Sequence, residues 1–433
     1  MTVSPPLTLP QAEGDTNPDA VRRDAVRRPN CRSCGTELRT SVVDLGLSPP
    51  SNALTPPSAL GRGETFYPLH AYVCDRCRLM QLDVFASPEE LFRDYRYFSS
   101  YSSTWLAHAA AYADEMMRRG IGPGSRVVEV ASNDGYLLRN FVARGVGVLG
   151  IEPASNVAAV ARLAGVPTID EFFGVALAGR VRAEFGPANL IVANNVLAHV
   201  PDINDFVAGF ARLLAPNGVA TFEFPHLLRT IAGMQFDTIY HEHFSYLSLI
   251  ALVPLFARHG LEIVEVTELP THGGSLRVFV APRGSRTIHA SADAILAAER
   301  AAGLERRETY AEFGERVVRI KDDFLSFLLD AKRRGKRVAG YGAAAKATTL
   351  LNYAGARADL IAYVADKSPH KQGNFIPGVR VPIVAPDRIR ADRPDYVMIF
   401  PWNVEAEIRA ELADVRGWGG RFVLAIPELR VDA

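Results

Sequence analysis

Tyr240, His241, Glu242 and His243 place four side chains that can carry or hydrogen-bond a proton in one short stretch. Packing alone rarely requires such a run. Histidine has an ordinary pKa of about 6.5, so it can both accept and release a proton near neutral pH. A tyrosine hydroxyl or a second imidazole beside it could stabilise a developing negative charge. The sequence therefore indicates a proton-transfer site here.

The residues around this site leave several roles open. Glu242 could orient an imidazole or hold a substrate hydroxyl, or it could be a buried salt-bridge partner. His199 follows a predicted strand and two asparagines, so it could stabilise a developing negative charge, act as a second acid or base, or simply pack in the core. His241 would point away from its neighbours in a regular strand, and we expect it to be a bystander. His241 and His243 could also be half of a metal site, although no clear third ligand lies nearby in the sequence.

A strand, a loop and an acidic residue upstream predict a nucleotide-binding edge. Glu152 ends a predicted strand 23 residues after Glu129, close to the spacing of about 20 at which an acidic residue accepts hydrogen bonds from a ribose. The loop is not G-x-G-x-x-G, which together with Asn194 and Asn195 favours S-adenosylmethionine over NAD. A Rossmann-like domain without a working site is the alternative. The expected cofactor-binding residues are Glu129, Ala131, Ser132, Asn133, Gly135, Glu152, Pro153 and Asn194.

The elements that must position these residues alternate between strand and helix. Strands are predicted at 126–131, 146–151, 189–193 and 218–224, and helices at 136–144 and 202–214. Such alternation predicts a parallel, doubly wound sheet. Ligands of these sheets bind at the carboxyl ends of the strands, which is where the residues of the two predicted sites would meet.

All four cysteines fall into one pattern. Cys31 and Cys34 form one C-x2-C pair, Cys74 and Cys77 form another, and 39 residues separate the pairs. Four thiolates in this arrangement are a closed tetrahedral site for structural zinc. The alternatives are disulfides or unrelated core thiols, but nothing else in the chain suggests an oxidising compartment.

Tyr95, Tyr97 and Tyr101 lie close together before a predicted helix at 104–119. They could form a lid that carries hydroxyl groups to the substrate, or an ordinary surface loop. The spacing does not decide between the two, and we retain all three as candidate substrate-binding residues.

The last third of the chain repeats the layout of the middle. A predicted helical stretch at 291–334 leads to a strand, a glycine turn and a helix at 336–346, and then to a strand at 360–364 before Asp366. Lys346 and the positive end of its helix suit a diphosphate. Asp366 and the loop 371–378 could shape the same site, and a purely structural Rossmann-like repeat is the alternative.

Composition excludes some function classes. Lys plus Arg and Asp plus Glu number 48 each, so no global field favours nucleic acid or an anionic membrane. No apolar run approaches the roughly 20 residues that span a bilayer. The first 30 residues have no apolar core of a secretory signal, and we expect a disordered leader and a cytoplasmic protein. The sequence does not give the oligomeric state, and a monomer is plausible.

Eight segments together carry a family resemblance. They are the two C-x2-C pairs, VVEVASNDGYLL, IEPASNVA, ANNVLAHVPDINDF, YHEHFSY, GGSLRVF and GYGAAAKATTLLNY. In this order the chain, from Cys31 to its end, resembles the nucleotide-sugar C-methyltransferases of deoxysugar biosynthesis. The resemblance implies an α/β protein with a small zinc-binding module at 31–90, a Rossmann-like S-adenosylmethionine domain at 91–290, and a linker helix with a Rossmann-like nucleotide-sugar domain at 291–433, after a leader at 1–30.

The resemblance also implies roles and a substrate. His243 matches the family's base, and Tyr240 matches the tyrosine near the keto oxygen. The usual substrate is a dTDP-4-keto-6-deoxysugar, methylated beside the ketone and commonly at C3. Methylation at C5, an O- or N-methyltransferase, and a zinc-bearing binding protein without activity are the alternatives.

Overall fold

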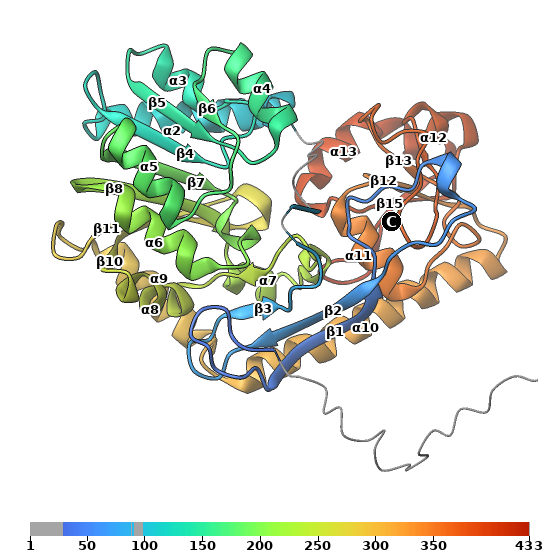
Figure 1. Ribbon diagram of the computed structural model, residues 1–433. Helices are drawn as coiled ribbons and strands as arrows, with labels where there is room; N and C mark the ends of the chain where they lie inside the picture. Colours follow the sequence, from blue (N-terminus) through green and yellow to red (C-terminus); the bar gives the residue numbers. More distant parts are fainter. Residues whose placement is uncertain (1–28, 88, 91–97, 433) are drawn as a thin grey trace, which may run out of the picture.

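The computed structural model describes residues 29–87, 89–90 and 98–432. Tyr95, Tyr97 and nearly all of the predicted leader lie outside these residues. Figure 1 shows two large domains side by side, with a small set of strands below and between them. In the described part of the chain, no helix has both the length and the apolar character needed to cross a membrane.

A seven-stranded sheet forms the first large domain. Its order is β10-β11-β8-β7-β4-β5-β6, and the five strands from β8 to β6 are parallel. The strands are β4 (Arg126–Val130), β5 (Gly147–Ile151), β6 (Thr168–Ile169), β7 (Ala188–Asn194), β8 (Leu214–Pro225), β10 (Leu261–Leu269) and β11 (Ser275–Pro282). The chain turns from one side of the sheet to the other between β4 and β7, so the carboxyl ends of these two strands mark the expected ligand edge. This confirms the predicted parallel, doubly wound sheet.

Several helices of this domain begin at a residue whose side chain caps the first turn. Ser102, Asp202 and Ser248 each accept a hydrogen bond from a backbone N–H of the first turn, which satisfies a donor that the helix leaves free. The helices are α2 (Ser103–Arg118), α3 (Leu138–Val142), α4 (Ser155–Leu163), α5 (Val175–Glu184), α6 (Ile203–Leu213), α7 (Leu227–Ala232), α8 (Leu249–Arg258) and α9 (Ala290–Ala301). Together they cover the sheet and leave its carboxyl edge to the loops.

The small sheet at the N-terminus is antiparallel and has the order β1-β2-β3-β9. Its strands are β1 (Thr40–Ser48), β2 (Tyr67–Val73), β3 (Met80–Leu82) and β9 (Ser245–Tyr246). The fourth strand comes from far along the chain, directly after His243. The pairing of Gln81 with Ser245 therefore fixes the sequence after His243 against the cysteine-bearing segment.

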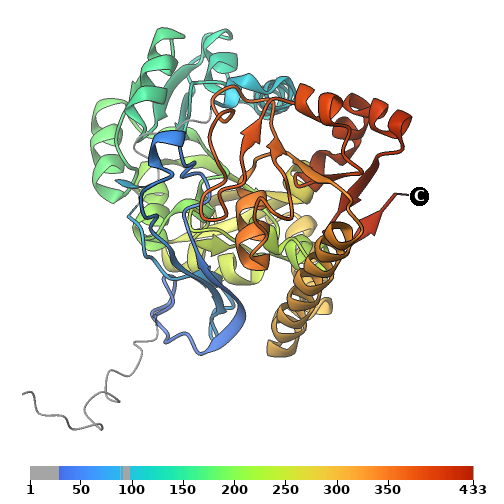
Figure 2. The same ribbon diagram turned by 90° about the vertical axis from the view of Figure 1, so that its right-hand side faces the viewer.

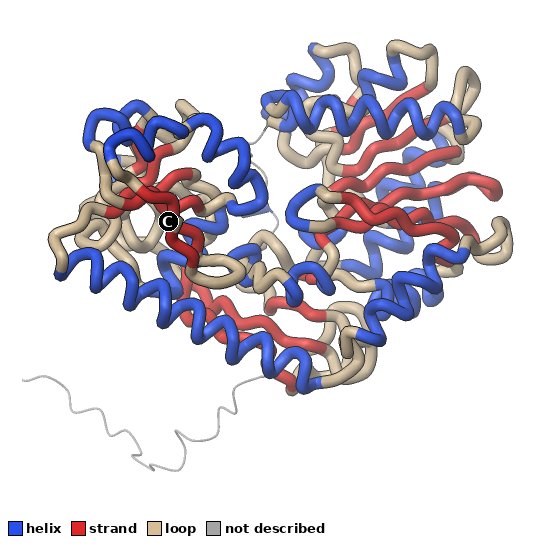
Figure 3. The backbone as a smooth tube through the Cα atoms, turned by 180° about the vertical axis from the view of Figure 1, so that it is seen from behind, coloured by secondary structure: helices blue, strands red, loops and turns tan. Residues whose placement is uncertain are grey.

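The predicted single helical stretch at 291–334 is wrong, because the chain breaks between α9 and α10 (Arg307–Arg333). Gly303 adopts φ +80°, a conformation that ends a helix and that a residue with a side chain rarely adopts. In Figure 2 the orange helix α10 stands along one side, and Figure 3 shows it running beneath the C-terminal domain and the small sheet. It packs on β1 and carries the chain into the C-terminal domain.

The C-terminal domain repeats the switch-point layout. Its sheet has the order β14-β13-β12-β15-β16-β17 and is parallel except for β17. The elements are β12 (Val338–Tyr341), α11 (Ala345–Ala354), β13 (Val364–Ala365), β14 (Ile383–Val384), α12 (Asp387–Asp392), β15 (Tyr396–Ile399), α13 (Glu405–Glu411), β16 (Arg421–Leu424) and β17 (Arg430–Val431). The strand predicted at 360–364 covers only the end of that range, because Leu360 and Ile361 turn back to bond the carbonyl of Arg357.

Candidate active site

Tyr240 to His243 form a reverse turn rather than a strand, since the N–H of His243 donates to the carbonyl of Tyr240 at 2.8 Å. The turn places the ring centres of Tyr240 and His243 4.0 Å apart, and the Tyr240 hydroxyl lies 3.0 Å from Nε2 of His243. Nδ1 of His243 lies 2.8 Å from the carbonyl of Thr238 and must donate to it. In the uncharged ring Nε2 therefore carries the lone pair, and the tyrosine hydroxyl donates to it.

His199 lies beside this pair, with its ring 4.8 Å from that of His243. It ends a short 3-10 helix, η3 (Leu197–His199), that follows β7. Its Nδ1 lies 2.6 Å from the carbonyl of Glu242, so it too donates through Nδ1. Two imidazoles and a phenol thus meet at the carboxyl edge of the sheet.

Both histidines of this cluster are uncharged at neutral pH. Burial lowers the pKa of His199. Burial also holds the pKa of His243 well below its ordinary value, and the nearby imidazole of His199 lowers it further. An uncharged imidazole can accept a proton, so the cluster has the protonation state that a base requires.

Glu242 and His241 are both buried but face other parts of the protein. The Glu242 carboxylate accepts hydrogen bonds from the Ser51 hydroxyl at 2.9 and 3.0 Å and from the Asn52 side chain at 3.1 Å. It therefore ties the turn to the segment after β1, while its backbone carbonyl orients His199. His241 places Nε2 3.2 Å from the carbonyl of Pro68.

The loop after β4 has an unusual backbone. Ala131 and Asn133 adopt φ values of 57° and 50°, and Gly135 adopts 78°. Glu152 supports this loop, because its two carboxylate oxygens accept the N–H groups of Asn133 at 3.0 Å and Ala154 at 2.9 Å. Pro153 follows in the turn to α4. Each oxygen of Glu152 retains a second lone pair for a ligand hydroxyl.

Several polar atoms at this edge are buried and lack a hydrogen-bond partner among the described residues. They are Oγ of Ser132, Oδ1 of Asp134 and Oδ1 of Asn195, and beside them the buried side chains of Glu129 and Asn194 have polar atoms whose nearest candidate partner is the Tyr136 hydroxyl. Burial raises the pKa of Glu129 well above its ordinary value, and the charge of Glu152 adds to this. Buried polar groups are normally satisfied, so these atoms fit a ligand rich in polar groups, such as the ammonium, the ribose hydroxyls and the adenine amino group of S-adenosylmethionine.

No contact among the described residues links Tyr101 to Tyr240, His243 and His199, which are called the histidine cluster below. The Tyr101 ring is 74% exposed and stacks on Phe98 at 5.4 Å. The neighbouring backbone does reach the cofactor loop, since the N–H groups of Ser99 and Ser100 donate to the side chains of Asn133 and Asp134 at 2.9 and 3.1 Å.

Lys346 lies on α11 of the C-terminal domain, which docks against the chain just before the turn. Thr349 of the same helix donates to the carbonyl of Ile239 at 2.9 Å, which docks α11 directly before the turn. The Lys346 ammonium lies 4.3 Å from the centre of the Trp402 ring, and its charge further lowers the pKa of His243. Asp366 takes the place that Glu152 has in the first domain, because it accepts the N–H of Ala343 after β12 at 2.8 Å.

The four cysteines form a cluster of the size that zinc requires. Their sulfurs lie within 4.8 Å of one another, and the pairs Cys31–Cys77 and Cys34–Cys74 are both 3.5 Å apart. Zinc–sulfur bonds of about 2.3 Å give a tetrahedron with edges of about 3.8 Å. Both knuckles make the same turn, with the carbonyls of Cys31 and Cys74 accepting N–H groups four residues later. The residues present therefore fit a structural zinc ion.

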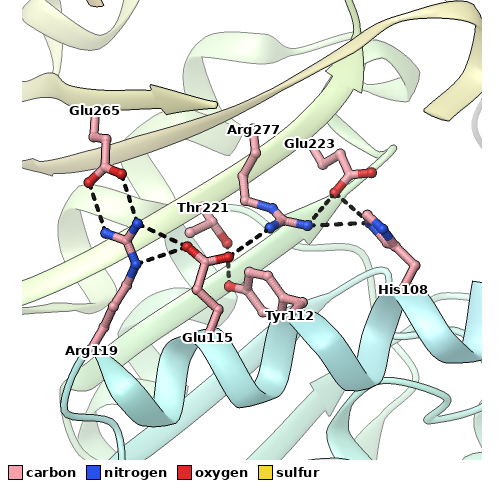
Figure 4. A network of polar contacts seen from close by, with 8 residues as sticks. All are labelled: His108, Tyr112, Glu115, Arg119, Thr221, Glu223, Glu265 and Arg277. Atoms are coloured by element: carbon pink, nitrogen blue, oxygen red, sulfur yellow. Dashed lines mark hydrogen bonds and ion pairs between the residues drawn. The ribbon is translucent and has the colours of Figure 1, made fainter. Parts of the chain in front are cut away.

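Three polar features near the site were not predicted from the sequence. His272 lies in a loop beside the histidine cluster. Asp237 is buried and accepts the indole N–H of Trp402 at 2.9 Å, and burial raises its pKa to about 6. Figure 4 shows a network in which buried Glu223 binds His108 and Arg277. Arg277 lies within the apolar strand SLRVF, and this buried cation is the one local sequence signal that a buried carboxylate lies opposite it.

Comparisons with known proteins agree with this arrangement. Residues 31–92 match a family model described as "Putative zinc binding domain", 105–266 a "Methyltransferase domain", and 270–427 a "C-methyltransferase C-terminal domain". C-methyltransferase NovU of Streptomyces niveus is 38% identical over 403 residues, which cover 93% of this chain and 96% of that protein.

Solved structures resemble part of the chain. Magnesium protoporphyrin IX methyltransferase (ChlM) from Synechocystis with bound SAM is 13% identical, covers 40% of this chain and 78% of its own, and has a TM-score of 0.31. A SAM-dependent methyltransferase from Thermotoga maritima is 16% identical, covers 42% of this chain and 95% of its own, and has a TM-score of 0.32. Given the full-length relative and the matched domains, the chain belongs to the family of S-adenosylmethionine-dependent C-methyltransferases.

Proposed function

We propose that this enzyme methylates the carbon next to the ketone of a dTDP-4-keto-6-deoxysugar, at C3. The observation that carries the proposal is the cluster of Tyr240, His243 and His199, buried where the carboxyl edge of the first sheet meets α11. A carbon acid next to a ketone requires a base and a group that stabilises the enolate oxygen. The relative named C-methyltransferase supports transfer to carbon rather than to oxygen or nitrogen.

His243 is the proposed base. Its Nε2 lone pair accepts the proton from carbon, while the hydrogen bond from Nδ1 to Thr238 holds the ring and stabilises the resulting cation. The bonding electrons left on carbon form the enolate. A positioned general base contributes on the order of 10²–10⁴ in rate.

Tyr240 and His199 are the proposed stabilisers of the enolate. The Tyr240 hydroxyl, which points at His243 in this structure, turns its hydrogen bond to the keto oxygen when substrate is present. The backbone carbonyl of Glu242 accepts a hydrogen bond from Nδ1 of His199 and so orients the His199 ring, which is the proposed second acid or base. One such hydrogen bond contributes about 3 kcal/mol to the transition state. S-adenosylmethionine, when bound, supplies the methyl group and takes the electrons of the carbon–sulfur bond.

In this proposal the carboxyl edge of the first sheet binds the cofactor, and the carboxyl edge of the C-terminal sheet binds the nucleotide of the substrate. Glu152 accepts hydrogen bonds from the cofactor ribose, and Glu129 and Asn194 take the remaining polar groups. Lys346 binds the diphosphate of the nucleotide, with the backbone N–H groups at the start of α11. Asp366 shapes the loop that presents them. The contribution of Tyr95, Tyr97 and Tyr101 to substrate binding stays a prediction.

The test is deuterium exchange from solvent into a dTDP-4-keto-6-deoxysugar, followed by NMR with and without S-adenosylhomocysteine. We expect enzyme-dependent exchange at C3, and no exchange with a His243→Asn variant that still binds the cofactor product. Exchange at C5 would show that the methylated carbon is C5 rather than C3. Absence of exchange with tight cofactor binding, together with methylation of a hydroxyl or amine, would refute carbon-acid chemistry.

A further inference from the structure

The loop that carries His272 has a strained backbone. His272 lies within the 3-10 turn η5 (Thr271–Gly273) and adopts φ 54° and ψ 26°, a left-handed conformation that residues with a side chain seldom adopt. Gly273 and Gly274 follow with φ values of 84° and 114°. A Cβ atom on Gly273 would lie 2.5 Å from the Trp402 ring, so the loop passes tightly against the C-terminal domain.

Hydrogen bonds fix this loop from three directions. The Ser275 hydroxyl donates to the carbonyl of Thr271 at 2.9 Å, and the Gln235 amide donates to the carbonyl of Gly273 at 3.0 Å. The Thr271 hydroxyl donates to Glu223 at 3.2 Å, and Glu223 belongs to the buried network in Figure 4. The surrounding structure therefore holds His272 in a conformation that glycine would adopt without strain.

The imidazole of His272 lies between the two predicted ligand edges. Its ring is 5.5 Å from that of Trp105, which stacks at 6.2 Å on Tyr136, the residue after the cofactor loop. The next residue, Gly273, passes against the Trp402 ring, and the Lys346 ammonium lies 4.3 Å from the centre of that ring. A charge on His272 would also lower the pKa of His243. The side chain is thus near the base, the cofactor loop and the diphosphate-binding lysine of the proposed function.

His272 differs from the other histidines of the cluster in having no bonding partner. Neither ring nitrogen is hydrogen-bonded to a residue in the described part of the chain, and the residue is exposed, so both nitrogens are accessible to a ligand. Surrounding protein and the charge of Lys346 lower its pKa to about 4. The ring is therefore uncharged, and it offers one donor and one acceptor.

A packing role does not account for these observations. The contact with Trp105 needs only an apolar surface, and a left-handed backbone favours glycine or asparagine over histidine. A strained residue that the structure holds in place is a reason to look for a function. The exposed ring nitrogens, which no described residue bonds, are placed to exchange hydrogen bonds with a ligand.

We propose that His272 is a further catalytic residue that hydrogen-bonds a polar substituent of the sugar ring and so holds the ring against His243. This inference rests on the proposed function and extends it to the recognition of the sugar. A hydroxyl or amino group on the ring would take both the donor and the acceptor of the imidazole.

The strained backbone provides an unusually clean test. His272→Gly removes the imidazole and relieves the strain, so the variant should fold with a melting temperature equal to or above that of the wild type. We expect unchanged affinity for S-adenosylhomocysteine and a loss in kcat/KM on the order of ten- to a hundredfold, with weaker binding of the nucleotide sugar by calorimetry. His272→Asn tolerates the same backbone and keeps a donor and an acceptor, so it should recover part of the loss.

Arg393→Gly is the matched control. Arg393 also adopts a left-handed conformation, with φ 48°, at the exposed end of α12. It should gain stability without any change in kcat or KM. Wild-type kinetics and sugar affinity in His272→Gly would overturn the inference, as would a variant that loses cofactor and sugar binding together. Failure of the proposed function is distinguishable, because the wild-type enzyme would then show neither exchange nor methylation with the 4-keto sugar.

Discussion

Arg277→Met should destabilise the enzyme strongly, because Arg277 is the cation of the buried network in Figure 4. It is 4% exposed, it contacts Glu223 at 3.0 Å and Glu115 at 3.2 Å, and its guanidinium lies 4.6 Å from the centre of the Tyr112 ring. Methionine keeps most of the volume but leaves the fully buried Glu223 without its cation. Breaking a buried pair in this way costs about 3–5 kcal/mol.

The melting temperature should fall by about 6–20 °C, since each kcal/mol shifts a domain of this size by about 2–4 °C. The double variant Glu223→Leu with Arg277→Met removes both charges, so it should be less destabilised than Arg277→Met alone. Arg119→Met is the control in the same network. Arg119 is 40% exposed and pairs with Glu265 at the surface, where such a pair contributes about 0–1 kcal/mol.

The pH dependence adds an independent check. Burial alone would raise the pKa of Glu223, but hydrogen bonds from His108 and the charge of Arg277 bring it below the ordinary value of 4.5. The ionised carboxylate therefore stabilises the fold above that pH, and the stabilisation is lost as the pH falls through the lower folded-state pKa. The stability difference between wild type and Glu223→Gln should shrink below about pH 4.5.

Thermal and urea unfolding, followed by circular dichroism, measure all of these quantities. A fall of less than about 2 °C in Arg277→Met would refute the reasoning, and so would strict additivity of the two single changes. Because Glu223 also anchors Thr271, we expect the single variant to lose sugar affinity at temperatures where it is still folded.

Three further predictions follow from the site. Since the pKa of His243 lies well below its ordinary value, kcat/KM should stay constant from pH 8 down to at least about 6.5; a half-maximal rate above pH 7 would exclude His243 as an isolated base. Glu152→Ala should weaken S-adenosylhomocysteine binding about tenfold and leave dTDP binding unchanged, and Lys346→Ala should do the reverse; calorimetry on both variants checks the division between the two edges. Elemental analysis should find one zinc ion per chain, and a metal-free protein with an unchanged melting curve would contradict the zinc site.

The sequence predicted the elements whose signals are local. The buried strand predicted at 126–131, the helices predicted at 104–119 and 202–214 and the paired cysteine knuckles depend on residues close together in the chain. The structure has a strand at Arg126–Val130, helices at Ser103–Arg118 and Ile203–Leu213, and the four cysteines in one cluster. The break at Gly303 was missed because apolar periodicity continues on both sides of it. A glycine inside a helical pattern was the available signal.

The parts that could not be predicted depend on contacts distant in sequence. Tyr240 to His243 turn because the chain on one side contacts α11 and the chain on the other pairs with β3. Nothing within the motif itself specifies this turn. The role of Glu242 has the same origin, since its carboxylate partners, Ser51 and Asn52, lie about 190 residues earlier. For His272 the sequence shows only a histidine before two glycines.

The turn at His243 therefore lies where the first large domain, the small N-terminal sheet and the C-terminal domain meet. A structural zinc ion in the small N-terminal part can therefore affect activity. Cys77 leads directly into β3, and β3 holds the turn both by its pairing with β9 and by the bond from the N–H of Leu82 to the carbonyl of Phe244 at 3.0 Å. Zinc binding supplies folding energy to that segment. The metal is far too enclosed by its four thiolates to take part in proton transfer. Its loss should nevertheless release one side of the turn, so that the distance between His243 and His199 is no longer fixed, and activity should fall with zinc even where the first domain still binds its cofactor.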